Sequence, residues 1–249
     1  MMELAGRITT ASNATFLGHI GTGDDTTAVV YKPVRGEKPL WDFPDHTLAH
    51  REVAAYLVSE ATGWNIVPTT WLGEGRFGTG MLQLWQDADP GQDPVDLVPA
   101  GEIPPGHHHV LDGYDADDVA VSVIHEDSPA LRRMAVFDVL VNNADRKGAH
   151  ILPMADGHRY GVDHGVTFHT EPRLRTVLWG WIGQPLTGEE LTGVTAVREG
   201  LEADLGEALA EHLSPAELHA LRRRCDDLSE TGVFPGPAGD MPAVPWPVF

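Results

Sequence analysis

The sequence lacks the features that define several large classes of protein. Its 249 residues include a single cysteine, Cys225, which excludes an internal disulfide and a cysteine-based zinc site. We interpret Cys225 as a buried helix residue and not as a nucleophile. No apolar run approaches the roughly 18 residues that span a bilayer, and the N-terminal stretch has no apolar core after a basic start. We therefore expect no integral membrane association, no secretory signal and a cytoplasmic location.

Positive charge is also scarce. Lysine and arginine number 17 against 37 aspartates and glutamates, which gives a formal net charge of −20. Such a field repels nucleic-acid phosphates and anionic lipid headgroups, so we expect no nucleic-acid partner. Solubility is the simpler explanation of the charge itself. The longest basic run, Arg222-Arg223-Arg224, lies in a helical pattern, and we interpret it as a solvated helix face.

The composition nevertheless allows a sizeable core. With 42% apolar and 22% charged residues, the chain suits one large domain or two small lobes. We predict three antiparallel strands over residues 6–32, with a hairpin turn at 21–25. Apolar residues at helical spacing predict a helix over 47–62, capped by Asp45 or Thr47. Two more strands follow at 67–72 and 80–85, so residues 1–86 hold five strands and one helix.

The second part of the chain is predicted to be mainly helical. Residues 86–113 are dense in Asp, Pro and Gly and favour a linker or long surface loop. His107-His108-His109 lies inside it and could bind a transition metal, although no carboxylate or cysteine stands at ligand spacing. Residues 115–124 fit a helix or a strand. Further helices are expected at 195–213 and 214–228, which makes the fold class α+β.

Residues 128–168 carry the strongest signal in the sequence. Ser128 as N-cap and Pro129 at the first position predict a helix that is apolar on nearly every face. Asp138 within this helix must be paired or lie at its edge. The helix leads into the polar cluster 142–147, and two short strands follow, the second ending at Asp163. A buried helix that delivers carboxylates and amides to one place favours a functional role.

Four charged residues in separate segments suggest phosphoryl transfer. Lys32 ends a predicted strand, and Glu52 lies beside the apolar stripe of the 47–62 helix. Asp145 follows the central helix, and Asp163 ends a later strand. Phosphoryl transfer needs a cation on the phosphates, an anion that holds it, an aspartate at the nucleophile and metal ligands. The alternative is a core helix that ends in an ordinary polar loop.

Four motifs carry a resemblance to a known family. They are Ser12-Asn13-Ala14-Thr15, Tyr31-Lys32-Pro33, Asn142-Asn143-Ala144-Asp145-Arg146-Lys147-Gly148-Ala149-His150-Ile151-Leu152, and Val162-Asp163-His164-Gly165. In this order the sequence resembles the actinobacterial relatives of the phosphatidylinositol 3-/4-kinases, a branch of the protein-kinase-like superfamily, over residues 12–168. The resemblance implies a bilobal fold. An antiparallel β-rich N-lobe would span residues 1–86 and a mainly helical C-lobe 87–249.

The resemblance also implies roles for individual residues. Lys32 would contact the α/β-phosphates of ATP and pair with Glu52, and Asp145 would accept or orient the proton of the acceptor hydroxyl. Lys147 would neutralise the γ-phosphate, and Asp163 would coordinate the metal. The remaining implied contacts are the phosphate-covering loop at Ser12 and Asn13 and the main-chain adenine contacts of Gln83, Leu84 and Trp85.

The sequence departs from the family pattern at His150, where an amide oxygen is expected as the second metal ligand. Mg²⁺ prefers oxygen ligands, whereas imidazole suits Mn²⁺ and softer ions. His150 could therefore ligate Mn²⁺, bond a phosphate, or leave one metal site weak. We expect an ATP-dependent kinase that acts on a hydroxyl of a protein or soluble small molecule, since the charge disfavours a lipid headgroup. A nucleotide-binding pseudokinase and an AMP-transferring enzyme are the alternatives.

Overall fold

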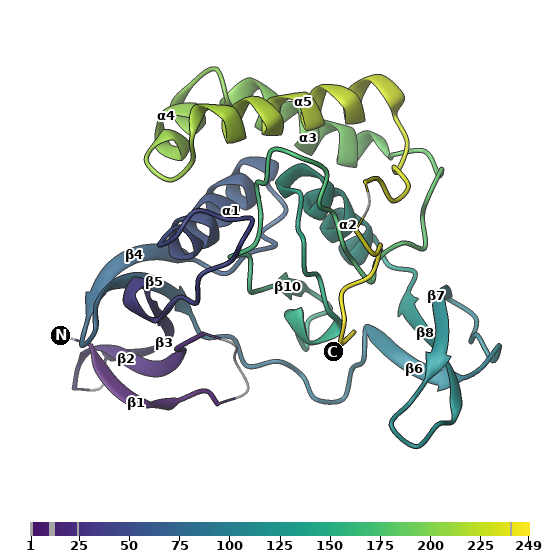
Figure 1. The fold of residues 1–249 in the computed structure, drawn as a ribbon, viewed down its shortest axis with the longest axis horizontal. Coiled ribbons are helices and arrows are strands. Elements are labelled where there is room, and N and C mark those ends of the chain that lie inside the picture. The colour runs from purple at the N-terminus through teal and green to yellow at the C-terminus, as the bar shows by residue number, and fades with distance from the viewer. Residues whose placement is uncertain (1, 10–12, 24, 240) are drawn as a thin grey trace.

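An antiparallel sheet and one helix make up the first part of the molecule (Figure 1). The computed structural model describes residues 2–9, 13–23, 25–239 and 241–249. The sheet has the order β1-β2-β3-β5-β4. Its strands are β1 (Glu3–Arg7), β2 (Phe16–Thr22), β3 (Asp25–Pro33), β4 (Thr70–Gly75) and β5 (Gly78–Leu84). The five strands expected in this part of the chain are therefore present, each paired antiparallel with its neighbours.

Strand β3 directs Lys32 away from the small core of this sheet. Val29 and Tyr31 are fully buried and pack with Leu82 of β5. Because successive side chains of a strand point to opposite faces, Lys32 projects from the other face. That face meets helix α1 (Leu48–Thr62), which contacts β4 and β5.

Helix α1 begins in a way that the sequence did not predict. Thr47 is its N-cap residue, but neither Thr47 nor Asp45 caps it through a side chain. The carboxylate of Glu37 instead accepts the N–H groups of Leu48 at 3.2 Å and Ala49 at 2.8 Å. The predicted N-cap position at Thr47 is therefore confirmed, but the side-chain cap comes from the preceding loop, where the Glu37 carboxylate accepts the orphan donors.

A second, three-stranded antiparallel sheet occupies much of the segment expected to be a linker. Its order is β6-β8-β7, with β6 (Val95–Pro99), β7 (His107–Tyr114) and β8 (Ala120–Glu126). The prediction of a structureless 86–113 segment was wrong for β6 and β7. Both are edge strands with mostly exposed or half-buried side chains, so they lack the apolar alternation that marks a strand. The ambiguous 115–124 stretch becomes the central strand β8, whose Val123 and Ile124 are buried.

Helix α2 (Pro129–Val141) lies at the centre of the main core. Ser128 Oγ accepts the Leu131 N–H and Pro129 occupies the first turn, as predicted. Leu131, Met134, Phe137 and Leu140 are all fully buried. After α2 come a 3₁₀ turn (Gly148–His150) and the hairpin of β9 (Ile151–Pro153) and β10 (Arg159–Gly161).

Three C-terminal helices cover α1 and α2 from one side (Figure 1). They are α3 (Gly188–Gly200), α4 (Asp204–Ala210) and α5 (Pro215–Thr231). The single helix expected over 195–213 is therefore two helices, because α3 starts earlier, at the Thr187–Glu190 capping box, and the chain turns before α4. Cys225 is buried on α5, as expected, and burial raises the pKa of its thiol to about 12.

The chain thus has the predicted α+β class, with two lobes: antiparallel sheets in its N-terminal half and helices towards its C-terminus. Residues 233–239 then leave the end of α5, and residues 241–249 lie towards the β9–β10 hairpin (Figure 1). None of the helices in the described residues is long and apolar enough to cross a membrane.

Candidate functional site

Three charged side chains from distant parts of the chain meet at Lys32. Its Nζ lies 2.6 Å from Glu52 Oε1 and 2.6 Å from Asp163 Oδ1. Glu52 is almost fully buried on α1, and its second oxygen accepts the His164 N–H at 2.8 Å. The predicted Lys32–Glu52 pair is therefore present, and Asp163 joins it.

The charges of this cluster depend on one another. Burial works against the charge of Lys32, but Asp163 and Glu52 together raise the pKa of its ammonium group. Lys32 in turn holds the pKa of Asp163 well below its usual range. Burial raises the pKa of Glu52, against the attraction of Lys32. At neutral pH Lys32 is thus a firmly charged cation between two carboxyl groups.

Asp145 sits on the loop that follows α2, held by its neighbours. Its N–H donates to Asn143 Oδ1 at 3.0 Å, and its Oδ2 lies 3.3 Å from Lys147 Nζ. Burial raises the pKa of Asp145, which Lys147 partly counteracts. A carboxylate with a raised pKa is a better proton acceptor, which suits the role predicted for Asp145.

His150 faces Asp163 with its Nε2 atom. The other ring nitrogen, Nδ1, is 2.8 Å from the carbonyl oxygen of Asp145, so Nδ1 carries a proton and donates it. In the neutral ring Nε2 is then a lone pair, 3.4 Å from Asp163 Oδ2. Burial lowers the pKa of His150, which disfavours a second proton on the ring. Two acceptors therefore face each other, an arrangement that a cation between them would satisfy.

A buried ion pair that sequence reasoning did not identify holds this loop to α2. The fully buried Arg146 donates to both oxygens of Asp138 at 2.9–3.2 Å, and also to the carbonyl groups of His150 and Val162. Asp138 is therefore paired, as the sequence required. The signal in the sequence was an aspartate within the apolar part of the helix, but only the fold shows that Arg146 is its partner.

The cluster around Lys32 lines a cavity of about 220 Å³. It is bounded by Lys32, Glu52, Asp145, Asp163 and Asn13, together with the exposed Lys38, which sequence reasoning missed. Asn13 Oδ1 accepts the Lys38 N–H at 3.0 Å, which fixes the loop at this edge. Ser12, predicted beside Asn13, lies outside the described residues. Lys147 does not line the cavity and reaches it only through Asp145.

The residues predicted to contact adenine lie apart from this cavity. Gln83 is buried, and its side chain donates to Thr70 Oγ1 at 2.9 Å. The N–H groups of Leu84 and Trp85 donate to the carbonyl groups of residues 69 and 28, each at 3.0 Å. Main-chain donors for an adenine ring would therefore have to come from residues that follow Trp85. Sequence alone did not show this, because it does not reveal where strand pairing stops.

The donors present fit a small divalent cation. His150 Nε2 and the Asp163 carboxylate supply one nitrogen and at least one oxygen, a set that suits Mn²⁺ better than Mg²⁺. Over residues 2–9, 13–23, 25–239 and 241–249, however, no group of three or more His, Cys, Asp or Glu side chains is gathered as a complete metal site. The triple histidine at 107–109 lies on β7, where His109 Nε2 pairs with Asp112.

Comparison with known proteins places the chain in a family. No family model matches it. The Mycobacterium tuberculosis (strain ATCC 25618 / H37Rv) protein named Protein Rv2133c is 52% identical over 257 positions, covering all of this chain and 92% of that protein. The chain belongs to the family of Protein Rv2133c. The name of that relative states no activity, so the function of this chain has to be inferred from the residues of the site.

One solved structure is also similar in outline. The crystal structure of a Helicobacter pylori proinflammatory kinase, CtkA, matches 94% of this chain and 93% of that chain. The sequence identity is 11% and the TM-score is 0.47. We therefore infer function from the cavity around Lys32 and not from this likeness.

Proposed function

We propose that this protein is an ATP-dependent phosphotransferase that moves the γ-phosphoryl group to a hydroxyl of a protein or soluble small molecule. One observation carries the proposal: the ammonium group of Lys32 donates to both Glu52 and Asp163 at the wall of the cavity that Asp145 also lines. A charged lysine held by a buried glutamate, next to two further carboxylates, matches the needs of phosphoryl transfer. We also propose a lobe boundary at residues 86–87 and kinship with the phosphatidylinositol 3-/4-kinases.

Each residue of the cluster has a role in this proposal. Lys32 neutralises phosphate oxygens of the nucleotide, and Glu52 keeps its ammonium group in place. Asp145 takes the proton of the acceptor hydroxyl while the hydroxyl oxygen forms a bond to the γ-phosphorus. The bond between the γ-phosphorus and the oxygen that bridges to the β-phosphate breaks at the same time, which releases ADP. Lys147, beside Asp145, neutralises charge on the transferred group, and Lys38 adds a second cation at the cavity edge.

Asp163 and His150 would hold the divalent cation. When bound, this cation would neutralise phosphate charge during transfer. The side chain of Asp163 is half exposed, at 52%, and so remains accessible to a ligand although it pairs with Lys32. The imidazole favours Mn²⁺ over Mg²⁺ as the activating ion.

Replacing Asp145 tests the proposal. We expect Asp145→Ala to lower phosphoryl transfer from labelled ATP by about 10²–10⁴-fold, because the hydroxyl proton loses its acceptor. ATP-induced thermal stabilisation should persist, since Lys32 and Asp163 remain. The matched control is Asp117→Ala, which removes an exposed carboxylate and should leave turnover unchanged. Full activity of Asp145→Ala would show that Asp145 is not the base. The absence of a thermal shift of the native protein with any nucleotide would contradict the proposal as a whole.

His150 supports a second candidate function. With an imidazole where an amide oxygen is expected, one metal position is weakened, which favours a nucleotide-binding pseudokinase or an enzyme that transfers AMP. Mass analysis of the products from labelled ATP separates the three candidates. Phosphoryl transfer adds phosphate to the acceptor, adenylyl transfer adds AMP and releases pyrophosphate, and a pseudokinase binds ATP without product.

A further inference from the structure

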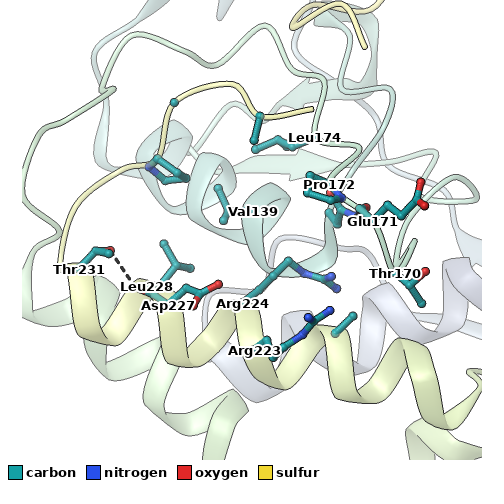
Figure 2. Close-up of a pocket in the computed structure, with 15 residues that line it drawn as sticks. Val139, Thr170, Glu171, Pro172, Leu174, Arg223, Arg224, Asp227, Leu228 and Thr231 are labelled. Carbon is teal, nitrogen blue, oxygen red and sulfur yellow. Dashed lines mark hydrogen bonds between the residues drawn. The ribbon is translucent and has the colours of Figure 1, made fainter. Parts of the chain in front are cut away.

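A second cavity of about 500 Å³ lies apart from the candidate phosphotransfer site (Figure 2). It is lined by α2, α5 and two irregular segments, residues 170–174 and 235–238. It shares no lining residue with the cavity around Lys32. A volume of this size accommodates a small organic molecule.

The walls of this cavity are mainly apolar. They are formed by Val139, Pro172, Leu174, Ala220, Leu228 and Pro235. Val139 points from α2 towards α5, and Leu174 closes the opposite side (Figure 2). Such walls suit the hydrocarbon or aromatic body of a ligand.

The guanidinium group of Arg224 is a cation that lines the cavity on the α5 side. It departs from the solvated face predicted for the basic triplet. Arg222 pairs with Glu202, and Arg223 is exposed although it also lines the cavity, whereas Arg224 points inward from α5 (Figure 2). Its Nε donates to the carbonyl group of Leu140 at 2.7 Å, and its Nη1 lies 3.4 Å from the carbonyl oxygen of His169.

The Nη2 atom of Arg224 is buried and has no hydrogen-bond partner in the described residues. No carboxylate pairs with this guanidinium among the ion pairs of that part of the chain. Burial lowers the pKa of Arg224 to about 10, so the group remains a cation at neutral pH. A buried guanidinium without an anion is costly, and a bound anion would remove that cost.

Two other polar side chains around the cavity, those of Asn142 and Glu171, already have partners. Asn142 donates to the carbonyl groups of His169 and Glu171 and accepts the N–H of Arg173. The Glu171 carboxylate pairs with Arg173 at 3.0 Å. Of the buried polar side-chain atoms that line the cavity in the described chain, Nη2 of Arg224 is the one that lacks a partner.

Charge limits the kind of anion that fits. The carboxylates of Asp227 and Glu171 and the exposed guanidinium of Arg223 line the same cavity, and the whole chain carries a net charge of −20. One buried guanidinium nitrogen without a partner against that background suits a monoanion better than a doubly charged phosphate. We propose that this cavity binds a small amphipathic carboxylate, with its carboxylate on Arg224 and its apolar body along Val139 and Leu174.

Calorimetric titration of the full chain tests this proposal. Decanoate, below its micelle-forming concentration, should bind saturably with one site per chain. The matched neutral probe, decanol, should bind at least about tenfold more weakly, the loss expected when a hydrogen bond to a charged group is missing. Decyl phosphate, the dianionic probe, should also bind more weakly than decanoate.

Two arginines of α5 provide a matched pair of variants. Arg224→Gln should weaken decanoate binding at least about tenfold, whereas Arg222→Ala, at a residue that pairs with Glu202 and does not line the cavity, should leave it within about twofold. If Arg224→Gln does not fold, as judged by circular dichroism, Val139→Phe decides instead. That variant keeps the cation but fills the apolar space, and it should abolish binding.

Several results would overturn the proposal. Decanol binding as tightly as decanoate would show that Arg224 does not recognise an anion, and tighter binding of decyl phosphate would contradict a monoanion. No saturable decanoate binding, or unchanged binding to folded Arg224→Gln or Val139→Phe, would remove the site. The proposal is independent of phosphotransfer and stands or falls on these titrations alone.

Discussion

At the scale of single residues, Lys32 is the side chain on which the candidate site depends. It is the cation that keeps the buried Glu52 and the nearby Asp163 from facing each other as unpaired carboxylates. Removing one partner of a buried ion pair leaves an uncompensated charge, which costs more than the pair contributes. Lys32 therefore serves both stability and the proposed nucleotide binding.

We expect Lys32→Met to lower the free energy of unfolding by about 3 kcal/mol at neutral pH. Without Lys32, burial raises the pKa of Glu52 further above its unfolded value, so the folded state binds the proton more tightly than the unfolded state. Stability is then highest at low pH and falls as the pH rises through the folded pKa of Glu52. Denaturant unfolding at about pH 5 and about pH 8 should show a larger deficit at the higher pH.

The matched control for this change is Lys38→Met. Lys38 is exposed and lines the same cavity, so its loss should change stability by less than about 0.5 kcal/mol at either pH. Equal effects of the two lysine substitutions, or a Lys32→Met deficit that does not vary with pH, would contradict the charge balance described for Glu52.

At the scale of elements, the C-terminal segment supports the loop that carries Asp145. The Gly148 N–H donates to the carbonyl group of Val248 at 2.8 Å. A Cβ added at Gly148 would come within 2.6 Å of the Phe249 ring. This segment also accepts hydrogen bonds from Thr176 and Trp179 at the Ala243 carbonyl group. The end of the chain thus buttresses the turn between Lys147 and His150.

Removing residues 243–249 should therefore impair transfer more than nucleotide binding. We expect phosphoryl transfer to fall at least about tenfold, because the loop loses its support and small displacements of catalytic groups are costly. ATP-induced thermal stabilisation should remain, since Lys32 lies on β3. Trp246→Ala, which truncates a side chain that is 77% exposed, is the control and should retain activity. Unchanged transfer by the shortened chain would show that the segment does not position the loop.

Helix α5 offers a separate test of local stability. Ser214 and Glu217 form a capping box at its start, and Glu217 also pairs with Arg51 of α1. We expect Ser214→Ala to lower the free energy of unfolding by about 1 kcal/mol, because an orphan N–H of the first turn loses its acceptor. Denaturant unfolding measures this. Ser229→Ala, at an exposed position within the same helix, should be neutral or slightly stabilising, and equal losses from both would exclude a capping effect.

At the scale of the whole molecule, the net charge of −20 affects which molecules could accept the phosphoryl group in the proposed reaction. We expect no co-sedimentation with phosphatidylserine vesicles at about 0.1 M salt, because like charges repel within a Debye length. Phosphatidylcholine vesicles serve as the neutral control for binding through exposed apolar side chains. Tight association with the anionic vesicles alone would bring lipid headgroups back as acceptors.

Local patterns in the sequence determined the elements whose own residues specify them. The β-branched run before Lys32 predicted β3, and apolar residues at helical spacing predicted α1. Ser128-Pro129, followed by mostly apolar residues, predicted α2. The order of Lys32, Glu52, Asp145 and Asp163 also identified the candidate cluster, since each residue lies at the end of, or beside, a recognisable element.

Only the tertiary structure decided the contacts between distant segments. Lys32 and Asp163 are 131 positions apart, and no periodicity relates them. The contact of Arg224 with Leu140 likewise joins residues 84 positions apart. The Glu37 cap of α1 and the Asp138–Arg146 pair span only 12 and 8 positions, but they depend on how the intervening loop folds and not on a periodic pattern. The half-exposed edge strands β6 and β7 were hidden because backbone pairing with β8, and not side-chain burial, holds them. Hydrophobic periodicity is a local property that can be read along the chain. The partner of a charged side chain depends instead on which groups the fold brings within bonding distance.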